Sequence, residues 1–162
     1  MMKSKSADLS YSELQSCPIW LMLAIIGLIL VSLIPSLFVG GSHRNPSAGI
    51  LAVIITALVF TSNMLYMRTK IAANKLKISF GFLVPYYFRT ISLAEIKSTK
   101  VVIFSPLTEY GGWGIKANAK GGRCLTMQGN TGVHLTFRDS KTLLIGSKSP
   151  ELLASAIKDA AH

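Results

Sequence analysis

Charged residues are scarce in this 162-residue chain, and acidic residues are the scarcest. Only 15% of the residues are charged, with 7 Asp and Glu against 17 Lys and Arg, whereas an average soluble domain has roughly 25%. The 2 cysteines disfavour a disulfide-rich secreted scaffold, and the composition disfavours disorder and collagen-like repeats. Hydrophobic residues make up 50% of the chain, and the net charge is +10. This balance predicts a membrane protein with a basic soluble part.

Two long segments contain no charged residue at all. They cover residues 18–39 and 48–67, and a helix of that length spans a hydrocarbon core of ~30 Å. Buried core helices are one alternative. A cleaved signal peptide is another for the first segment, since Lys3 and Lys5 precede it, but the segment is longer than a signal-peptide core and no clear cleavage site follows. We therefore predict a two-helix transmembrane hairpin.

The basic residues around these segments predict how the hairpin is oriented. The short linker over 40–47, GGSHRNPS, holds one basic residue, the segment 1–17 holds two, and residues 68–77 hold four. By the positive-inside rule, both termini lie in the cytoplasm and the linker lies outside. The prediction is a multi-pass protein of the plasma (inner) membrane. It has a cytoplasmic N-terminal segment over 1–17, a hairpin over 18–67 and a cytoplasmic domain over 68–162.

The domain over 68–162 has the pattern of short strands followed by one helix. Apolar and polar residues alternate over 76–80 and 133–137, which is the period of a half-buried strand. Further strands are predicted at 86–93, 101–104 and 142–145, with glycine-containing turn signals between them. Strands spaced so regularly predict an antiparallel barrel or sandwich.

The last helix has its own start signals. Ser149 suits a helix cap, Pro150 the first helical position, and Glu151 the positive end of the helix dipole. One face of the predicted helix is apolar and is expected to pack against the sheet. That face consists of Leu152, Leu153, Ala156, Ile157 and Ala160.

Three motifs carry a resemblance to a known family. They are YGGWGIK over 110–116, GVHLTF over 132–137 and LIGSKSPELL over 144–153. With the predicted hairpin, they resemble the bacterial PH-like domain membrane proteins. The resemblance implies a strongly bent sheet of about seven strands with one open end closed by the C-terminal helix, and it specifies architecture without chemistry. The residues to which it gives a structural role are Gly111, Gly112, Trp113, Gly114, Gly132, Gly146 and Pro150.

The residues that carry catalytic or metal chemistry are isolated in the sequence. His134 has no other histidine near it, and Cys17 and Cys124 lack metal-ligand spacing. An enzyme would need a polar pocket that joins His134 to Glu95 or Glu109, and no pattern favours one. We predict no catalytic residue, no metal and no cofactor.

The glycines near residue 112 do not form a nucleotide-binding loop. A phosphate-binding loop needs G-x-x-x-x-G-K-[ST] between a strand and a helix, whereas Gly114 is followed by Ile115 and the neighbouring segments have strand patterns. These glycines are therefore predicted to bend the sheet, with Trp113 in the core beneath the bend.

A basic surface is the remaining candidate for function. Its predicted residues are Arg68, Lys70, Lys75, Lys77, Lys116, Lys120 and Arg123, and Lys97 and Lys100 could extend it. Such a surface can bind anionic lipid head groups, although the first four residues are also explained by topology. We predict a non-enzymatic membrane protein whose PH-like domain docks a protein partner or anionic lipid. The alternative is an assembly subunit held by its transmembrane helices. A protein partner or a homo-oligomer is expected, and nucleic acid is not.

Overall fold

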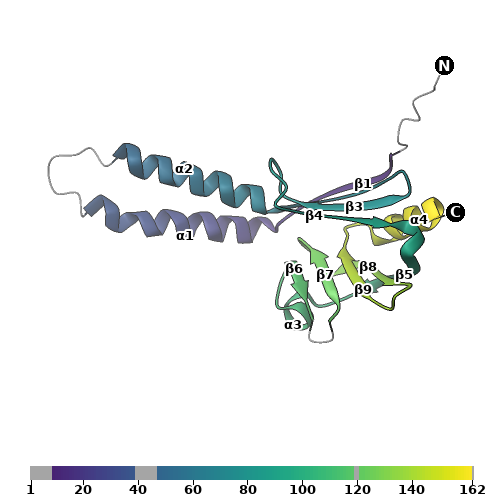
Figure 1. Ribbon diagram of the computed structural model, residues 1–162. Helices are drawn as coiled ribbons and strands as arrows, with labels where there is room; N and C mark the ends of the chain where they lie inside the picture. The colour runs from purple at the N-terminus through teal and green to yellow at the C-terminus, as the bar shows by residue number, and fades with distance from the viewer. Residues whose placement is uncertain (1–8, 39–46, 119–120, 162) are drawn as a thin grey trace, which may run out of the picture.

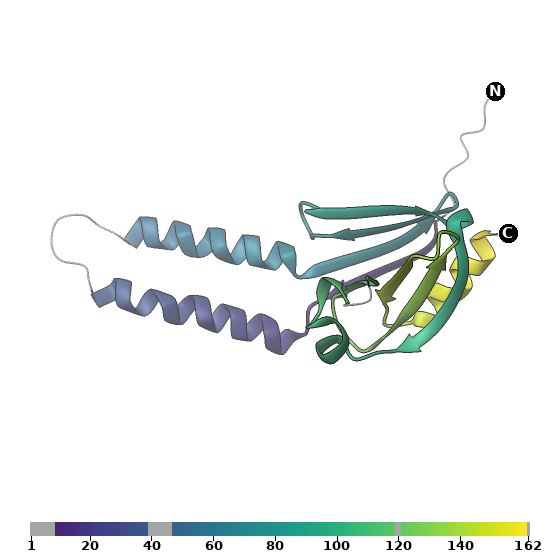
Figure 2. The same cartoon turned by 60° about the horizontal axis from the view of Figure 1, so that its bottom comes forward.

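Two β-sheets face each other, and two helices extend side by side from one end of the first sheet (Figures 1 and 2). The computed structural model describes residues 9–38, 47–118 and 121–161. The first part of the chain consists of β1 (Leu9–Ser16), α1 (Ile19–Phe38), α2 (Ser47–Met64), β2 (Tyr66–Ala72), β3 (Lys75–Phe80) and β4 (Tyr87–Ser92). The second part consists of the 3-10 helix η1 (Leu93–Glu95), β5 (Ile96–Ile103), α3 (Pro106–Tyr110), β6 (Gly114–Ala117), β7 (Arg123–Thr126), β8 (Thr131–Phe137), β9 (Thr142–Gly146) and α4 (Pro150–Ala161).

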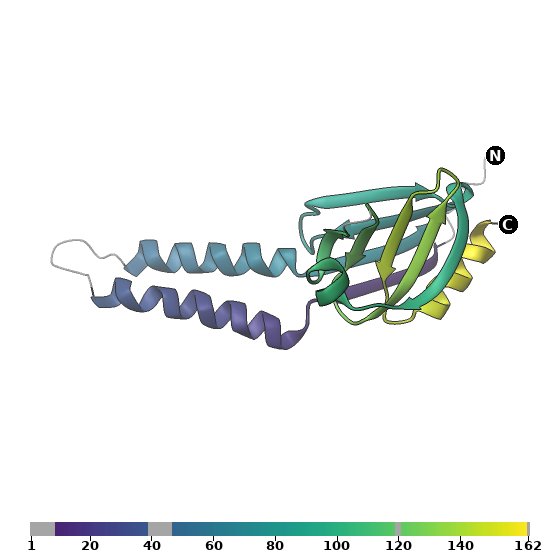
Figure 3. The same ribbon diagram turned by 90° about the horizontal axis from the view of Figure 1, so that it is seen from below.

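The two sheets differ in how their strands are connected. The first sheet has the order β1-β2-β3-β4, and all its neighbouring strands are antiparallel. The second has the order β5-β8-β9-β7-β6, in which β7 and β9 are parallel and the other pairs antiparallel. Seen from below, the second sheet lies in front of the first and α4 lies at one end of both (Figure 3).

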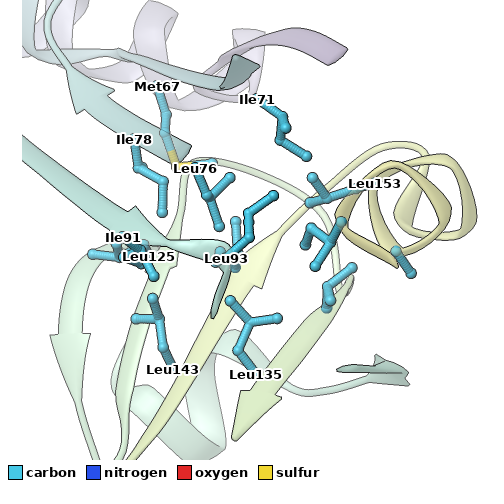
Figure 4. Packing of buried hydrophobic residues seen from close by; sticks show 14 of the residues in the cluster. Met67, Ile71, Leu76, Ile78, Ile91, Leu93, Leu125, Leu135, Leu143 and Leu153 are labelled. Carbon is cyan, nitrogen blue, oxygen red and sulfur yellow. The ribbon is translucent and has the colours of Figure 1, made fainter. Parts of the chain in front are cut away.

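The core lies between the two sheets, where apolar side chains from both inner faces meet those of α4 (Figure 4). Leu76 and Ile78 of the first sheet and Leu135 of the second are completely buried. Burial of a side chain of this size stabilises the fold by about 1.5–3 kcal/mol. From α4, Leu153 and Ile157 join the core, whereas Leu152, predicted on the buried face, is 64% exposed.

The strands expected from alternation are confirmed. The patterns over 76–80 and 133–137 correspond to β3 and β8, and those over 86–93 and 142–145 correspond to β4 and β9. The run at 101–104 is the end of a longer strand, β5. The described residues hold nine strands where about seven were expected. One of the additional strands, β1, comes from the segment 1–17, which was predicted to be separate from the domain.

The predicted transmembrane hairpin is wrong. Within the described ranges, no helix combines the length and the apolar character that crossing a membrane requires. This finding contradicts the predicted spans at 18–39 and 48–67 and the membrane-protein fold class. It also contradicts the multi-pass inner-membrane location with two cytoplasmic termini. The prediction rested on the absence of charge, which does not determine where a helix ends. The α2 helix stops at Met64, so its 18 residues extend about 27 Å, and the last two residues of the predicted span belong to β2.

Candidate functional site

A group of basic residues lies on the outer face of the first sheet, the side turned away from the core. Successive side chains of a strand point to opposite faces, so the buried residues of β2 and β3 direct their neighbours outward. Arg68 and Lys70 of β2 and Lys75 and Lys77 of β3 therefore share the outer face. We call these four residues the basic face.

The strand register brings three of these cations to one groove. Lys70 lies directly opposite Lys77, and Arg68 lies opposite Ser79. Thr90 of β4 lies opposite Lys77 on the other side. The groove has a volume of about 330 Å³ and is lined by Arg68, Lys70, Lys77, Ile78, Ser79, Phe88, Arg89 and Thr90. Like charges placed directly opposite each other destabilise a sheet, so an anion bound between Lys70 and Lys77 would relieve their repulsion.

The described carboxylates do not pair with the basic face. The groove lining contains no Asp or Glu, and within the described part of the chain no carboxylate forms an ion pair with any of the four cations. The one acidic residue of β1, Glu13, pairs with Thr69 and so lies on the inner side of the sheet. Its carboxylate accepts hydrogen bonds from the Tyr11 hydroxyl at 2.6 Å, the Ser147 hydroxyl at 2.7 Å and the Lys148 amide at 2.7 Å. The described carboxylates thus leave the positive charge of the basic face unneutralised.

Aromatic side chains border the basic face at the end nearest the helices. Phe88 of β4 lies opposite Ser79, lines the groove and is 77% exposed. Tyr66, the first residue of β2, shares the parity of Arg68, and its ring centroid lies 4.9 Å from that of Phe82. Exposed aromatic rings beside unpaired cations form a mixed surface that suits an anionic ligand with an apolar part.

The other predicted basic residues do not join this face. Lys116 is on β6 and Arg123 on β7, both in the second sheet. Their register places them on opposite sides of that sheet, because Lys116 pairs with Cys124 rather than with Arg123. Lys120 lies outside the described residues. Four of the predicted basic residues therefore lie together on the basic face, whereas Lys116 and Arg123 do not.

The motif residues shape turns and a close approach of strands. Gly111 ends α3 in the left-handed conformation, with φ of 70°. Gly132 of β8 lies opposite Gly146 of β9, and a Cβ atom on Gly132 would collide with the Ile145 carbonyl oxygen. Pro150 is the first residue of α4, as predicted.

Trp113 lies at the border of the second sheet rather than beneath a bend. Its side chain is partly exposed, and its indole N–H donates a hydrogen bond to the Gly129 carbonyl at 3.0 Å. The ring meets that of Trp20 at 6.4 Å between centroids, edge to face. This aromatic pair connects the first turn of α1 to the loop before β6.

Among the residues considered for catalysis or metal binding, Glu109 and the two cysteines have surroundings that limit their reactivity. Glu109 accepts a hydrogen bond from the Ser105 amide at 2.7 Å, and the described residues contain no cluster of three or more potential metal ligands. Burial, with a smaller contribution from Glu109, raises the pKa of Cys124 to about 12. Burial also raises the pKa of Cys17. Both thiols stay protonated at neutral pH and are poor nucleophiles.

No family model matches this chain, and no curated protein does either. The sequence predictions missed five residues of the groove lining: Ile78, Ser79, Phe88, Arg89 and Thr90. Within β3, Ser79 shares the parity of Lys75 and Lys77. Phe88 and Thr90, by contrast, join that face only through the pairing of β4 with β3, which the sequence pattern did not reveal.

Proposed function

We propose that this chain is a non-enzymatic binding module that docks on an anionic lipid surface through its basic face. The observation that carries the proposal is the gathering of four cations on one face of the first sheet, where none of the described carboxylates forms an ion pair with them. Each cation near an anionic lipid surface contributes ~1 kcal/mol. The exposed ring of Phe88 beside the groove favours lipid over a small soluble anion, because lipid offers apolar contact as well as charge.

The resemblance to PH-like domains is kept as part of this proposal. Two facing sheets with α4 at one end support it. A protein partner or a homo-oligomer, the other partners expected from the sequence, remains a prediction and becomes the favoured interpretation if lipid does not bind.

Flotation of the full chain with phospholipid vesicles tests the proposal. Vesicles of phosphatidylcholine alone are compared with vesicles that also contain phosphatidylglycerol, at low and raised salt. We expect the anionic vesicles to carry more protein and the difference to shrink as salt screens the charges. Equal flotation with both vesicle types would contradict the proposal, since apolar surface alone would then explain binding.

A pair of charge-matched variants locates the binding surface. In the first, Arg68, Lys70, Lys75 and Lys77 are all replaced by Gln. In the second, Lys97, Lys100, Lys116 and Arg123 are replaced in the same way, so that both variants lose four positive charges. We expect the first variant to lose the preference for anionic vesicles and the second to keep most of it. If the two behave alike, net charge rather than the basic face is responsible.

A further inference from the structure

The loop between β3 and β4 presents apolar side chains to solvent. Phe82, Leu83 and Val84 are 49%, 68% and 68% exposed, and Tyr86 is also exposed. Three consecutive apolar residues on the surface leave apolar area in water that burial would stabilise. We call residues 82–84 the apolar tip.

The backbone of the apolar tip is held in one conformation by a side chain of α2. The Asn63 side-chain oxygen accepts hydrogen bonds from the amides of Leu83 at 2.7 Å and Val84 at 3.0 Å. Its side-chain nitrogen donates to the Val84 carbonyl at 2.9 Å, and its backbone carbonyl accepts from the Phe82 amide at 3.1 Å. One asparagine therefore makes four hydrogen bonds to three consecutive residues.

Further contacts anchor the two ends of the loop. Gly81 has φ of 116°, and a Cβ atom there would collide with the Val84 carbonyl oxygen. At the other end, the Tyr86 hydroxyl donates a hydrogen bond to the Met64 carbonyl at 3.2 Å. The loop is thus fixed at both ends while its apolar side chains remain outside. Ordering a loop whose apolar side chains stay about half or more exposed suits a surface prepared for an external partner.

We propose that the apolar tip inserts into the apolar layer just beneath the head groups of the anionic lipid surface that the basic face contacts. This inference rests on the proposed function and adds the mode of contact. The occupant follows from continuity, because Phe82 packs on Tyr66 and Tyr66 lies on the same face of β2 as Arg68 and Lys70. Cations beside exposed apolar residues match head groups above acyl chains.

A polarity-sensitive dye attached at the tip tests insertion directly. The full chain is labelled at Leu83→Cys and, as a matched control, at Leu107→Cys. Leu107 is 63% exposed and lies on α3, the helix beside the second sheet. The native thiols of Cys17 and Cys124 are buried and react slowly. With phosphatidylglycerol vesicles, we expect a blue shift of the emission at position 83 and little change at position 107.

The possible outcomes separate the two proposals. A chain that binds anionic vesicles while the dye at position 83 stays in a water-like environment overturns insertion and leaves the docking proposal standing. Equal shifts at positions 83 and 107 also overturn insertion, because they indicate unspecific partitioning. No binding to anionic vesicles overturns the docking proposal and insertion with it.

The hydrogen bonds of Asn63 provide a second, independent measurement. Asn63→Ala leaves every apolar side chain in place but releases the loop, and Ser62→Ala is the control on the same helix, where the Ser62 hydroxyl bonds only within α2. We expect Asn63→Ala to weaken binding to anionic vesicles about fivefold through lost preorganisation, with unchanged thermal unfolding. Binding equal to that of Ser62→Ala would overturn the preformed tip.

Discussion

The outer faces of the two sheets differ in what covers them. On the second sheet, Phe104, Cys124 and Leu144 form a small buried cluster that is packed against by Tyr110 of α3. On the first sheet, no helix or strand of the described residues covers the outer face (Figure 1), and cations occupy it. The comparison teaches that the part of a sheet face that is covered within the chain is apolar, whereas the open face of the first sheet is charged and bordered by aromatic rings.

The largest expected difference in stability lies between substitutions on the inner and on the outer faces of the sheets. Leu135→Ala removes a completely buried side chain and is expected to lower the free energy of unfolding by about 2–5 kcal/mol. Lys77→Gln on the outer face is expected to change it by less than about 0.5 kcal/mol. Urea unfolding of the two variants measures both values. A large loss of stability in Lys77→Gln would show that the basic face is structural.

The next largest effect on stability is expected at the contact between the first sheet and the turn before α4. Glu13→Ala leaves the Tyr11 hydroxyl, the Ser147 hydroxyl and the Lys148 amide without their acceptor, so we expect a loss of about 1–3 kcal/mol in chemical unfolding. The control is Asp139→Asn, since the Asp139–Lys141 pair is an exposed surface ion pair of little value. A loss no greater than that of the control would argue against Glu13 as a link between the sheets.

Truncating Tyr110, which packs on the outer face of the second sheet, is expected to have a smaller effect on stability. The ring of Tyr110 meets that of Phe104 edge to face at 6.1 Å, and such pairs contribute about 0.5–1.5 kcal/mol beyond their burial. Tyr110→Ala should therefore destabilise the fold modestly and expose the buried cluster, which increased binding of a hydrophobic dye would report. Phe88→Ala, on the open sheet, should change neither quantity.

A last effect on stability is expected only at alkaline pH. Burial, followed by the hydrogen bond to Glu13, raises the pKa of Tyr11 to about 12. Because the ordinary value of 10 is lower, the folded state holds this proton more tightly, so its contribution is complete below pH 10 and is lost as pH rises towards 12. Cys124 adds to the same trend over a wider range. We expect urea midpoints to fall between neutral pH and about pH 11, and to fall less in Tyr11→Phe.

The domain elements were predicted where local pattern and tertiary environment agree. The alternation over β3 and β8 marks one buried face in each strand, and Ser149-Pro150-Glu151 marks the start of α4. β1 was missed because its inward positions include Glu13 and Gln15, which form hydrogen bonds with partners more than 100 residues away. An alternation of apolar and polar residues cannot reveal a strand whose buried face is polar.

The candidate site was predicted only in part, for the same reason. Four of its cations were recognised, but Lys116 and Arg123 could not be separated from them without knowing which strands pair. The role of Asn63 in holding the apolar tip could not be predicted from the sequence, because its partners Leu83 and Val84 are about 20 residues away. The absence of charge over 18–39 and 48–67 was read as a membrane hairpin, although it defined neither helix end.

The sequence by itself determined which faces of the strands are apolar, where α4 begins and how large the excess of positive charge is, because these depend on neighbouring residues alone. The tertiary structure decided which strands lie side by side, which cations gather into one groove and which apolar loop is held open beside it. Those features depend on contacts between residues far apart in the chain, and the free energy of such contacts is defined only once the two sheets have packed.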